Sequence, residues 1–254
     1  MKKYIIVTAL TGVIVFDFLA FPQTLLHGGK ILKKAKNYQS MIPVKRIRKI
    51  RLPEGYHEGL FIDGDNVWVN NGKGGKTWVV NLHSGRVVSE IEPVAGFSEG
   101  ITSARDGKYW ITDWTEKKLY RVTIEKGKMT AECGISLGPA RPTGVIRVGK
   151  RIFVITWTRG VLGTRYHLLL LDGLGNILDK IGIENISEPS QMAWDGAHLW
   201  ITSWFDRRAY KVDIEKLEIK GYFRPNVKNL TGIAWDGKSF WVTGTKADLY
   251  QIEI

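Results

Sequence analysis

The sequence predicts an all-β chain folded as a five-bladed β-propeller, and two observations support this prediction. A short motif recurs five times, and each copy lies about 40 residues after the previous one. Each interval holds about four strand-sized runs of β-branched and aromatic residues, which is the strand content of one propeller blade. The five copies of the motif begin at Trp68, Trp110, Phe153, Trp200 and Trp241.

A second repeated feature assigns each motif to a place within its blade. A Gly-Leu-like pair precedes every copy, and in four of the five units an Asp-Gly pair lies between the two. Asp-Gly tolerates the left-handed backbone of a two-residue hairpin, so the runs on either side are expected to be neighbouring antiparallel strands. The recurring motif is therefore predicted to be the second strand of each blade. Counting from Gly55 gives five units and no room for a sixth.

The fifth unit contains only three strand-sized runs. A propeller that lacked one strand of its last blade would have an open sheet edge. Residues 44–52, directly before the first unit, are expected to supply the missing strand. We therefore assign residues 44–254 to the propeller, with residues 44–52 as its closing strand.

The net charge of +12 is concentrated at the N-terminal end. Most of the excess lysine and arginine precedes residue 53, whereas the five units are nearly balanced in charge. The propeller therefore has no basic surface typical of nucleic-acid binding, and we expect no nucleic-acid partner.

The N-terminal residues predict export. Lys2 and Lys3 precede an apolar run from Tyr4 to Phe16, so residues 1–29 are typical of a signal or a membrane anchor. Residues 30–43 are lysine-rich and are expected to be a basic linker that could contact anionic lipid headgroups. The sequence thus predicts an extracytoplasmic protein, membrane-anchored or secreted. The single cysteine excludes an internal disulfide.

Three stretches carry a resemblance to a known family: residues 55–60 (GYHEGL), 96–102 (GFSEGIT) and 230–236 (LTGIAWD). They are similar to motifs of the plant and bacterial glutamine cyclotransferase (glutaminyl-peptide cyclotransferase) family, and the likeness covers about residues 44–254. This resemblance implies a five-bladed propeller that converts the N-terminal glutamine of peptides to pyroglutamate and releases ammonia. It also implies that no metal or cofactor is used.

The resemblance further implies which residues form the site. Glu99 falls on the acidic catalytic residue, Trp114 and Trp204 fall on tryptophans that line the substrate pocket, and Phe97 lies beside them. In the family, the residue before each Gly-Leu pair points into the mouth of the central channel. Those positions are here Glu58, Glu99, Thr143, Ser190 and Thr231. The pocket departs from the family pattern, because Glu58, Thr143, Ser190 and Thr245 replace glutamine, tryptophan, asparagine and lysine.

The chemistry of these residue types agrees with the resemblance. Cyclisation needs a proton removed from the attacking amine and another delivered to ammonia, and one carboxyl with a raised pKa can do both. Glu99 is the candidate, and Glu58 would raise a pKa further by like-charge repulsion, although two such carboxylates could instead be solvated or bind a small cation. Trp114, Trp157 and Trp204 end three consecutive second strands, which predicts either blade packing or an aromatic-walled pocket.

Three classes of function remain open. The first is a glutaminyl cyclase. The second is a non-catalytic propeller that binds a peptide terminus or a protein partner. The third is a metal-dependent hydrolase of the lactonase kind, but this class needs asparagine and aspartate around the channel ion, where the sequence has threonine and serine. The five histidines have no ligand-like spacing, so no zinc site is expected.

Overall fold

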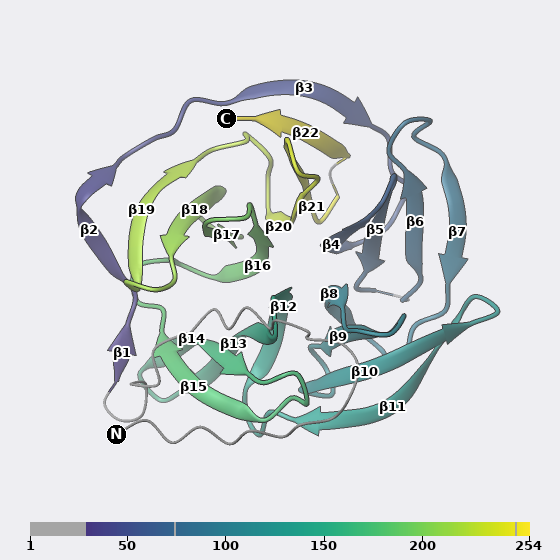
Figure 1. Cartoon of the computed structure of the whole chain (residues 1–254), viewed down its shortest axis with the longest axis horizontal. Coiled ribbons are helices and arrows are strands. Elements are labelled where there is room, and N and C mark those ends of the chain that lie inside the picture. The colour runs from purple at the N-terminus through teal and green to yellow at the C-terminus, as the bar shows by residue number, and fades with distance from the viewer. Residues whose placement is uncertain (1–28, 74, 247) are drawn as a thin grey trace, which may run out of the picture.

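The protein is a five-bladed β-propeller (Figure 1). A computed structural model describes residues 29–73, 75–246 and 248–254, and their regular structure consists of strands alone. Five sheets surround a central axis, which confirms the predicted fold class. The predicted signal or anchor lies almost entirely outside the described residues. Within the described part of the chain, no helix is long and apolar enough to cross a membrane.

Each blade contributes four antiparallel strands, numbered here from the axis outward. The innermost strands are β4 (His57–Asp63), β8 (Ser98–Ser103), β12 (Arg141–Val148), β16 (Pro189–Trp194) and β20 (Leu230–Trp235). The second strands are β5 (Asn66–Asn71), β9 (Tyr109–Asp113), β13 (Arg151–Gly160), β17 (Leu199–Ser203) and β21 (Phe240–Gly244). The third strands are β6 (Thr77–Asn81), β10 (Lys118–Glu125), β14 (Gly163–Leu171), β18 (Arg208–Asp213) and β22 (Leu249–Glu253). The outer strands are β7 (Val87–Ile91), β11 (Lys128–Ser136), β15 (Ile177–Gly182), β19 (Glu218–Phe223) and β3 (Lys45–Ile50).

The repeated motif is the second strand of each blade, as predicted. In two blades the aspartate of the Asp-Gly turn accepts a hydrogen bond from the tryptophan that begins the motif. In the fifth blade one oxygen of Asp236 accepts hydrogen bonds from the backbone N–H groups of Lys238 (2.8 Å) and Ser239 (2.6 Å). The other oxygen accepts the indole N–H of Trp241 at 2.7 Å. Asp195 and Trp200 repeat this bond in the fourth blade at 2.7 Å. The turn residue therefore satisfies the polar atom of a tryptophan that is otherwise buried in the core.

The hydrophobic core lies between neighbouring blades rather than within one sheet. Between the fourth and fifth blades, the ring of Trp200 lies 5.2 Å from that of Phe223 and 4.9 Å from that of Phe240. All three side chains are fully buried. Because each blade buries both faces against its neighbours, the ring of blades is stable only when it is closed.

The chain closes the ring as the sequence predicts. Strand β3 pairs antiparallel with β22, so that Ile50 lies opposite Leu249, and completes the fifth blade (Figure 1). The exposed side chains of β3 are Lys45, Arg46, Lys49 and Ile47, and the three cations suit an outermost strand in contact with solvent.

Residues 30–39 correct the expectation of a basic linker at residues 30–43. They form strands β1 (Lys30–Ile31) and β2 (Lys33–Gln39), which pair in parallel with β15 and β19 as fifth strands of the third and fourth sheets. Leu32 between them is fully buried against the core of these two blades, and the Lys30 ammonium lies 2.9 Å from the Asp179 carboxylate. The remaining lysines point to solvent, which is why the composition resembles that of a linker.

A closed set of hydrogen bonds joins the five blades around the axis, and we call it the inter-blade ring. In each blade one polar side chain donates to a backbone carbonyl of the next blade. The five bonds run from Asn70 to Glu99 (3.4 Å), Thr112 to Thr143, Thr143 to Pro189 (3.4 Å), Ser190 to Thr231 (3.3 Å) and Thr231 to His57 (2.9 Å).

Four glycines allow the innermost strands to approach this closely. A β-carbon at Gly100 would lie 2.7 Å from the Thr143 carbonyl oxygen, and one at Gly232 would lie 2.6 Å from that of Glu58. Gly59 and Gly144 have the same role. In the fourth blade the equivalent residue is Gln191, whose side chain is buried and crosses the axis to donate from Nε2 to the Glu99 carbonyl at 3.1 Å. Gln191 therefore packs against the space left open at Gly59 and Gly144.

We predict that Gln191→Ala lowers the free energy of unfolding by about 1–3 kcal/mol, because it creates a cavity at the axis and removes one hydrogen bond to Glu99. Denaturant unfolding of the full chain measures this effect. Gln251→Ala, at a partly exposed position of β22, is the matched control and should change stability by no more than about 0.5 kcal/mol. Equal losses in both variants would contradict the packing role of Gln191.

Candidate functional site

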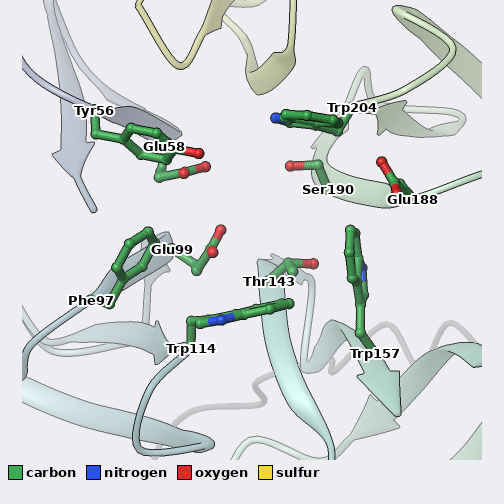
Figure 2. Close-up of a pocket in the computed structure, with 10 residues that line it drawn as sticks. All are labelled: Tyr56, Glu58, Phe97, Glu99, Trp114, Thr143, Trp157, Glu188, Ser190 and Trp204. Carbon is green, nitrogen blue, oxygen red and sulfur yellow. The ribbon is translucent and has the colours of Figure 1, made fainter. Parts of the chain in front are cut away.

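A pocket of about 340 Å³ opens at the face of the ring opposite the β4–β5 hairpin turn and its equivalents. Five aromatic side chains and three carboxyl groups surround it (Figure 2). Its lining residues are Tyr56, Glu58, Phe97, Glu99, Trp114, Thr143, Trp157, Glu188, Ser190 and Trp204. The structure thus brings together every residue that the sequence nominated as catalytic or substrate-binding. Thr231, expected at the channel mouth, is not among the lining residues.

A bulge in each innermost strand directs side chains into the pocket. Pairing between the innermost and second strands shifts register at equivalent places in all five blades, for example between Ser98 and Ile101 in β8. Glu58, Glu99, Thr143 and Ser190 occupy these shifts. Because a bulge re-aims the side chain it contains, residues that would otherwise face a neighbouring blade point toward the axis.

Glu58 and Glu99 form a hydrogen-bonded carboxyl pair at the base of the pocket, and only 4% and 7% of their surfaces are exposed. Burial raises the pKa of Glu99 to about 8, against the opposing effect of the hydrogen bond from Glu58, and the charge of Asp113 raises it further. Burial, followed by the charge of Glu99 and the hydrogen bond to it, raises the pKa of Glu58 well above its ordinary value. The pair holds its protons at pH values where exposed glutamates are ionised.

Asp113 links this pair to the pocket wall. Its buried carboxylate accepts hydrogen bonds from the backbone N–H groups of Phe97 and Glu116, both at 2.7 Å. The backbone N–H of Trp114 in turn donates to the Phe97 carbonyl at 3.1 Å. The segment before Glu99 and the segment that carries Trp114 are therefore held together, so the acid and its aromatic neighbour keep a fixed relation.

The aromatic walls include two contacting pairs. Trp114 and Trp157 meet edge to face with ring centroids 5.4 Å apart, and the indole N–H of Trp157 donates to the Pro189 carbonyl at 2.7 Å. On the other side, Tyr56 and Phe97 meet with centroids 6.0 Å apart. Trp157 was expected either to pack within its blade or to face a pocket. It does both, because it contacts Tyr166 of its own sheet at 5.1 Å and lines the cavity.

Two residues that line the pocket, Tyr56 and Glu188, were not predicted from the sequence, although both occupy the same position within their repeats. Tyr56 and Glu188 lie two residues before the bulge residues Glu58 and Ser190, at the register that Phe97 occupies in the second blade. Aligning the repeats two residues further upstream would have identified them.

Glu188 has a distinctive environment. Its backbone is left-handed, with φ of 45°, and one carboxylate oxygen is buried without a hydrogen-bond partner among the described residues. Figure 2 shows this carboxylate across the pocket from Glu58 and Glu99, beside Trp157 and Trp204. A left-handed glutamate is strained, so the arrangement is costly unless a bound group uses the free acceptor.

The hydroxyl groups of Thr143, Ser190 and Thr231 serve the inter-blade ring rather than a cation, since each donates to a carbonyl of the next blade. Across residues 29–73, 75–246 and 248–254, no group of three or more histidine, cysteine, aspartate or glutamate side chains is arranged to hold a metal ion.

Comparison with known proteins places the fold and leaves the activity open. No protein-family model matches the chain, and no curated protein is similar enough in sequence to match it. Among solved structures, glutaminyl cyclase from Myxococcus xanthus is similar, with a TM-score of 0.67 and 15% identity over 83% of this chain and 95% of that one. The distant resemblance to glutaminyl cyclases is therefore shown at the level of structure.

Two other solved structures are similar to a smaller degree. A chain of the nidogen/laminin complex has a TM-score of 0.56 and 15% identity, over 78% of this chain and 84% of that one. A catalytically inactive virginiamycin B lyase from Staphylococcus aureus, in complex with quinupristin, has a TM-score of 0.51 and 16% identity, over 84% and 100%. At such low identities these likenesses establish the shared fold alone.

The carboxyl pair predicts a specific dependence of stability on pH. The folded protein holds protons on Glu58 and Glu99 that the unfolded chain, whose glutamates titrate near pH 4.5, has already released. The free energy of unfolding should therefore fall as the pH rises from about 4.5 through about 8, by up to about 1.4 kcal/mol per pH unit for each titrating carboxyl.

Denaturant unfolding over this pH range tests the dependence. The double variant Glu58→Gln/Glu99→Gln should show a flatter profile, because neutral amides replace both acids. Glu215→Gln, at an exposed position, should keep the wild-type slope. A double variant with the wild-type slope would mean that the pair ionises normally.

Proposed function

We propose that the protein is a glutaminyl-peptide cyclotransferase, which converts the N-terminal glutamine of a peptide to pyroglutamate with release of ammonia. The observation that carries this proposal is the buried Glu58–Glu99 pair at the base of an aromatic-walled pocket. A pocket of about 340 Å³ is large enough for one side chain and the adjoining backbone. The structural likeness to a glutaminyl cyclase supports the same reaction.

In the proposed reaction the α-amine of the substrate attacks the γ-amide carbon of its own side chain. A tetrahedral intermediate forms, its bond to the amide nitrogen breaks, and ammonia leaves. One proton departs from the attacking nitrogen and one is added to the leaving nitrogen. A single carboxyl can therefore act first as base and then as acid, and no other reactant is consumed.

Glu99 suits this role because its pKa of about 8 lies close to that of a peptide α-amine, about 7.7–8.0. Transfer of a proton between the two groups then costs little free energy in either direction. Glu58 acts as the positioning residue: its hydrogen bond orients the Glu99 carboxyl and stabilises the ionised form that accepts the proton.

The aromatic walls and Glu188 complete the proposed site. Trp114, Trp157 and Trp204 limit the access of water, which would otherwise compete with the amine and hydrolyse the amide to glutamate. The unpartnered oxygen of Glu188 accepts a hydrogen bond from an N–H group of the substrate, and this contact compensates the strain of its backbone.

We predict that the full chain releases ammonia from a peptide with N-terminal glutamine and that Glu99→Gln lowers kcat by about 10²–10⁴-fold, because the amide cannot carry the proton. Mass spectrometry detects the loss of ammonia from the peptide, and Glu215→Gln is the matched control on an exposed surface. If the folded wild-type protein binds the peptide without converting it, the alternative holds: the protein is a non-catalytic propeller that binds a peptide or a protein partner.

We also propose that the propeller lies outside the cytoplasm, attached through its N-terminal segment or secreted, on the basis of the apolar and basic N-terminal sequence. Cys133, the only cysteine of the chain, is exposed and provides a test. A membrane-impermeant maleimide added to intact cells should label the protein as fully as it does after lysis. Labelling only after lysis would place the propeller inside.

A further inference from the structure

A second cleft adjoins the pocket on the same face of the ring and shares two of its walls. It has a volume of about 600 Å³ and is lined by Trp114, Lys117, Pro139, Arg141, Trp157, Arg159 and Thr164. We call it the cationic cleft. The turn between β9 and β10, the segment that leads into β12 together with its first residue, and the β13–β14 hairpin supply these residues. Trp114 and Trp157 line both cavities, so the indole pair is the boundary between them.

The two cavities have opposite charge. The pocket is lined by three glutamates and by no lysine or arginine, whereas the cleft is lined by Lys117, Arg141 and Arg159 and by no acidic residue. None of these three cations forms an ion pair with a carboxylate within the described part of the chain. A cleft walled by unpaired charges of one sign attracts a ligand of the opposite sign.

Neighbouring acidic groups do not neutralise the cleft. Glu116, which precedes Lys117 in the chain, accepts hydrogen bonds from Tyr120 and Lys118 instead. Arg141 is fixed in place: its guanidinium lies 5.1 Å from the centre of the Trp114 ring and donates to the Trp114 carbonyl at 3.2 Å. Arg159 is exposed on the extended β13–β14 hairpin and free to contact a ligand.

From this geometry we infer that the substrates are peptides or proteins with aspartate or glutamate directly after the N-terminal glutamine. The inference rests on the proposed function, which places the glutamine in the pocket. The chain that follows must leave across the Trp114–Trp157 boundary. Since an extended peptide advances about 3.5 Å per residue, its second to fourth residues lie in the cationic cleft. Carboxylates at these positions complement Lys117, Arg141 and Arg159, and basic side chains are repelled.

The test compares peptides that begin Gln-Glu-Asp, Gln-Ala-Ala and Gln-Lys-Arg, with kcat/KM for ammonia release as the readout. The acidic peptide should exceed the basic one by about tenfold or more at low salt, and added salt should reduce the difference. A charge-reversed variant, Lys117→Asp/Arg159→Glu, should invert the order of the two peptides. Aspartate is chosen at Lys117 because the backbone there is left-handed, with φ of 57°.

Two further variants control the experiment. Arg105→Asp/Lys238→Glu makes the same change in net charge at exposed hairpin turns on the opposite face, and it should keep the wild-type preference. Lys117→Asn/Arg159→Gln removes two of the three charges without reversing them, and it should lower the acidic-to-basic ratio without inverting it, because Arg141 remains. This milder variant keeps the inference testable if charge reversal prevents folding.

Binding of the same fluorescently labelled peptides to the Glu99→Gln variant separates this inference from the proposed function. Cyclisation without a charge preference, or with a preference that the charge-reversed variant retains, would overturn the inference and leave the cyclase. Charge-dependent binding of the acidic peptide without cyclisation by the wild type would support the cleft and overturn the cyclase. If the protein neither cyclises the peptides nor binds them in a charge-dependent way, both the inference and the proposed function are overturned.

Discussion

The inter-blade ring is the constraint on which the rest of the molecule depends, because it sets the distance of the five innermost strands from the axis. Each of its donors must reach a carbonyl of the next blade, for example Thr231 to His57 at 2.9 Å. Such an approach requires glycine at Gly100 and at its equivalents in three other blades, Gly59, Gly144 and Gly232. The same local geometry produces the strand bulges, so one arrangement both closes the axis and points side chains into the pocket.

The ring also explains where the acids lie. In the third, fourth and fifth blades the bulge residue itself donates the inter-blade bond through a threonine or serine hydroxyl. In the first and second blades the bond comes from Asn70 and Thr112 on the second strand. The bulge residues of these blades, Glu58 and Glu99, do not make the inter-blade bond. In these two adjacent blades a second-strand residue makes the inter-blade bond, so the neighbouring side chains of Glu58 and Glu99 are available to line the pocket.

The sequence was most informative where residues repeat. The recurring tryptophan motif predicted five blades and their second strands, and the family resemblance at the Gly-Leu pairs implied that Glu58, Glu99 and Ser190 face the channel mouth, where the three line the pocket. Strands β1 and β2 were missed because they cover only the outer edges of two blades, and the buried apolar residues of this segment are few: Leu32 between the strands and Ala35 in β2. The cationic cleft was equally hidden, since Lys117, Arg141 and Arg159 come from three separate segments that only the closed ring brings together.

The N-terminal strands have a consequence for folding. Strands β1, β2 and β3 are synthesised first, yet each pairs with a strand that is made much later: β1 with β15, β2 with β19 and β3 with β22. Contacts between segments so far apart in the chain form slowly, because a long loop must close before they gain any stability. Until then the edges of β3 and of the unfinished last blade are open to pairing with other chains. Ring closure is thus possible only for a chain that has been synthesised through β22.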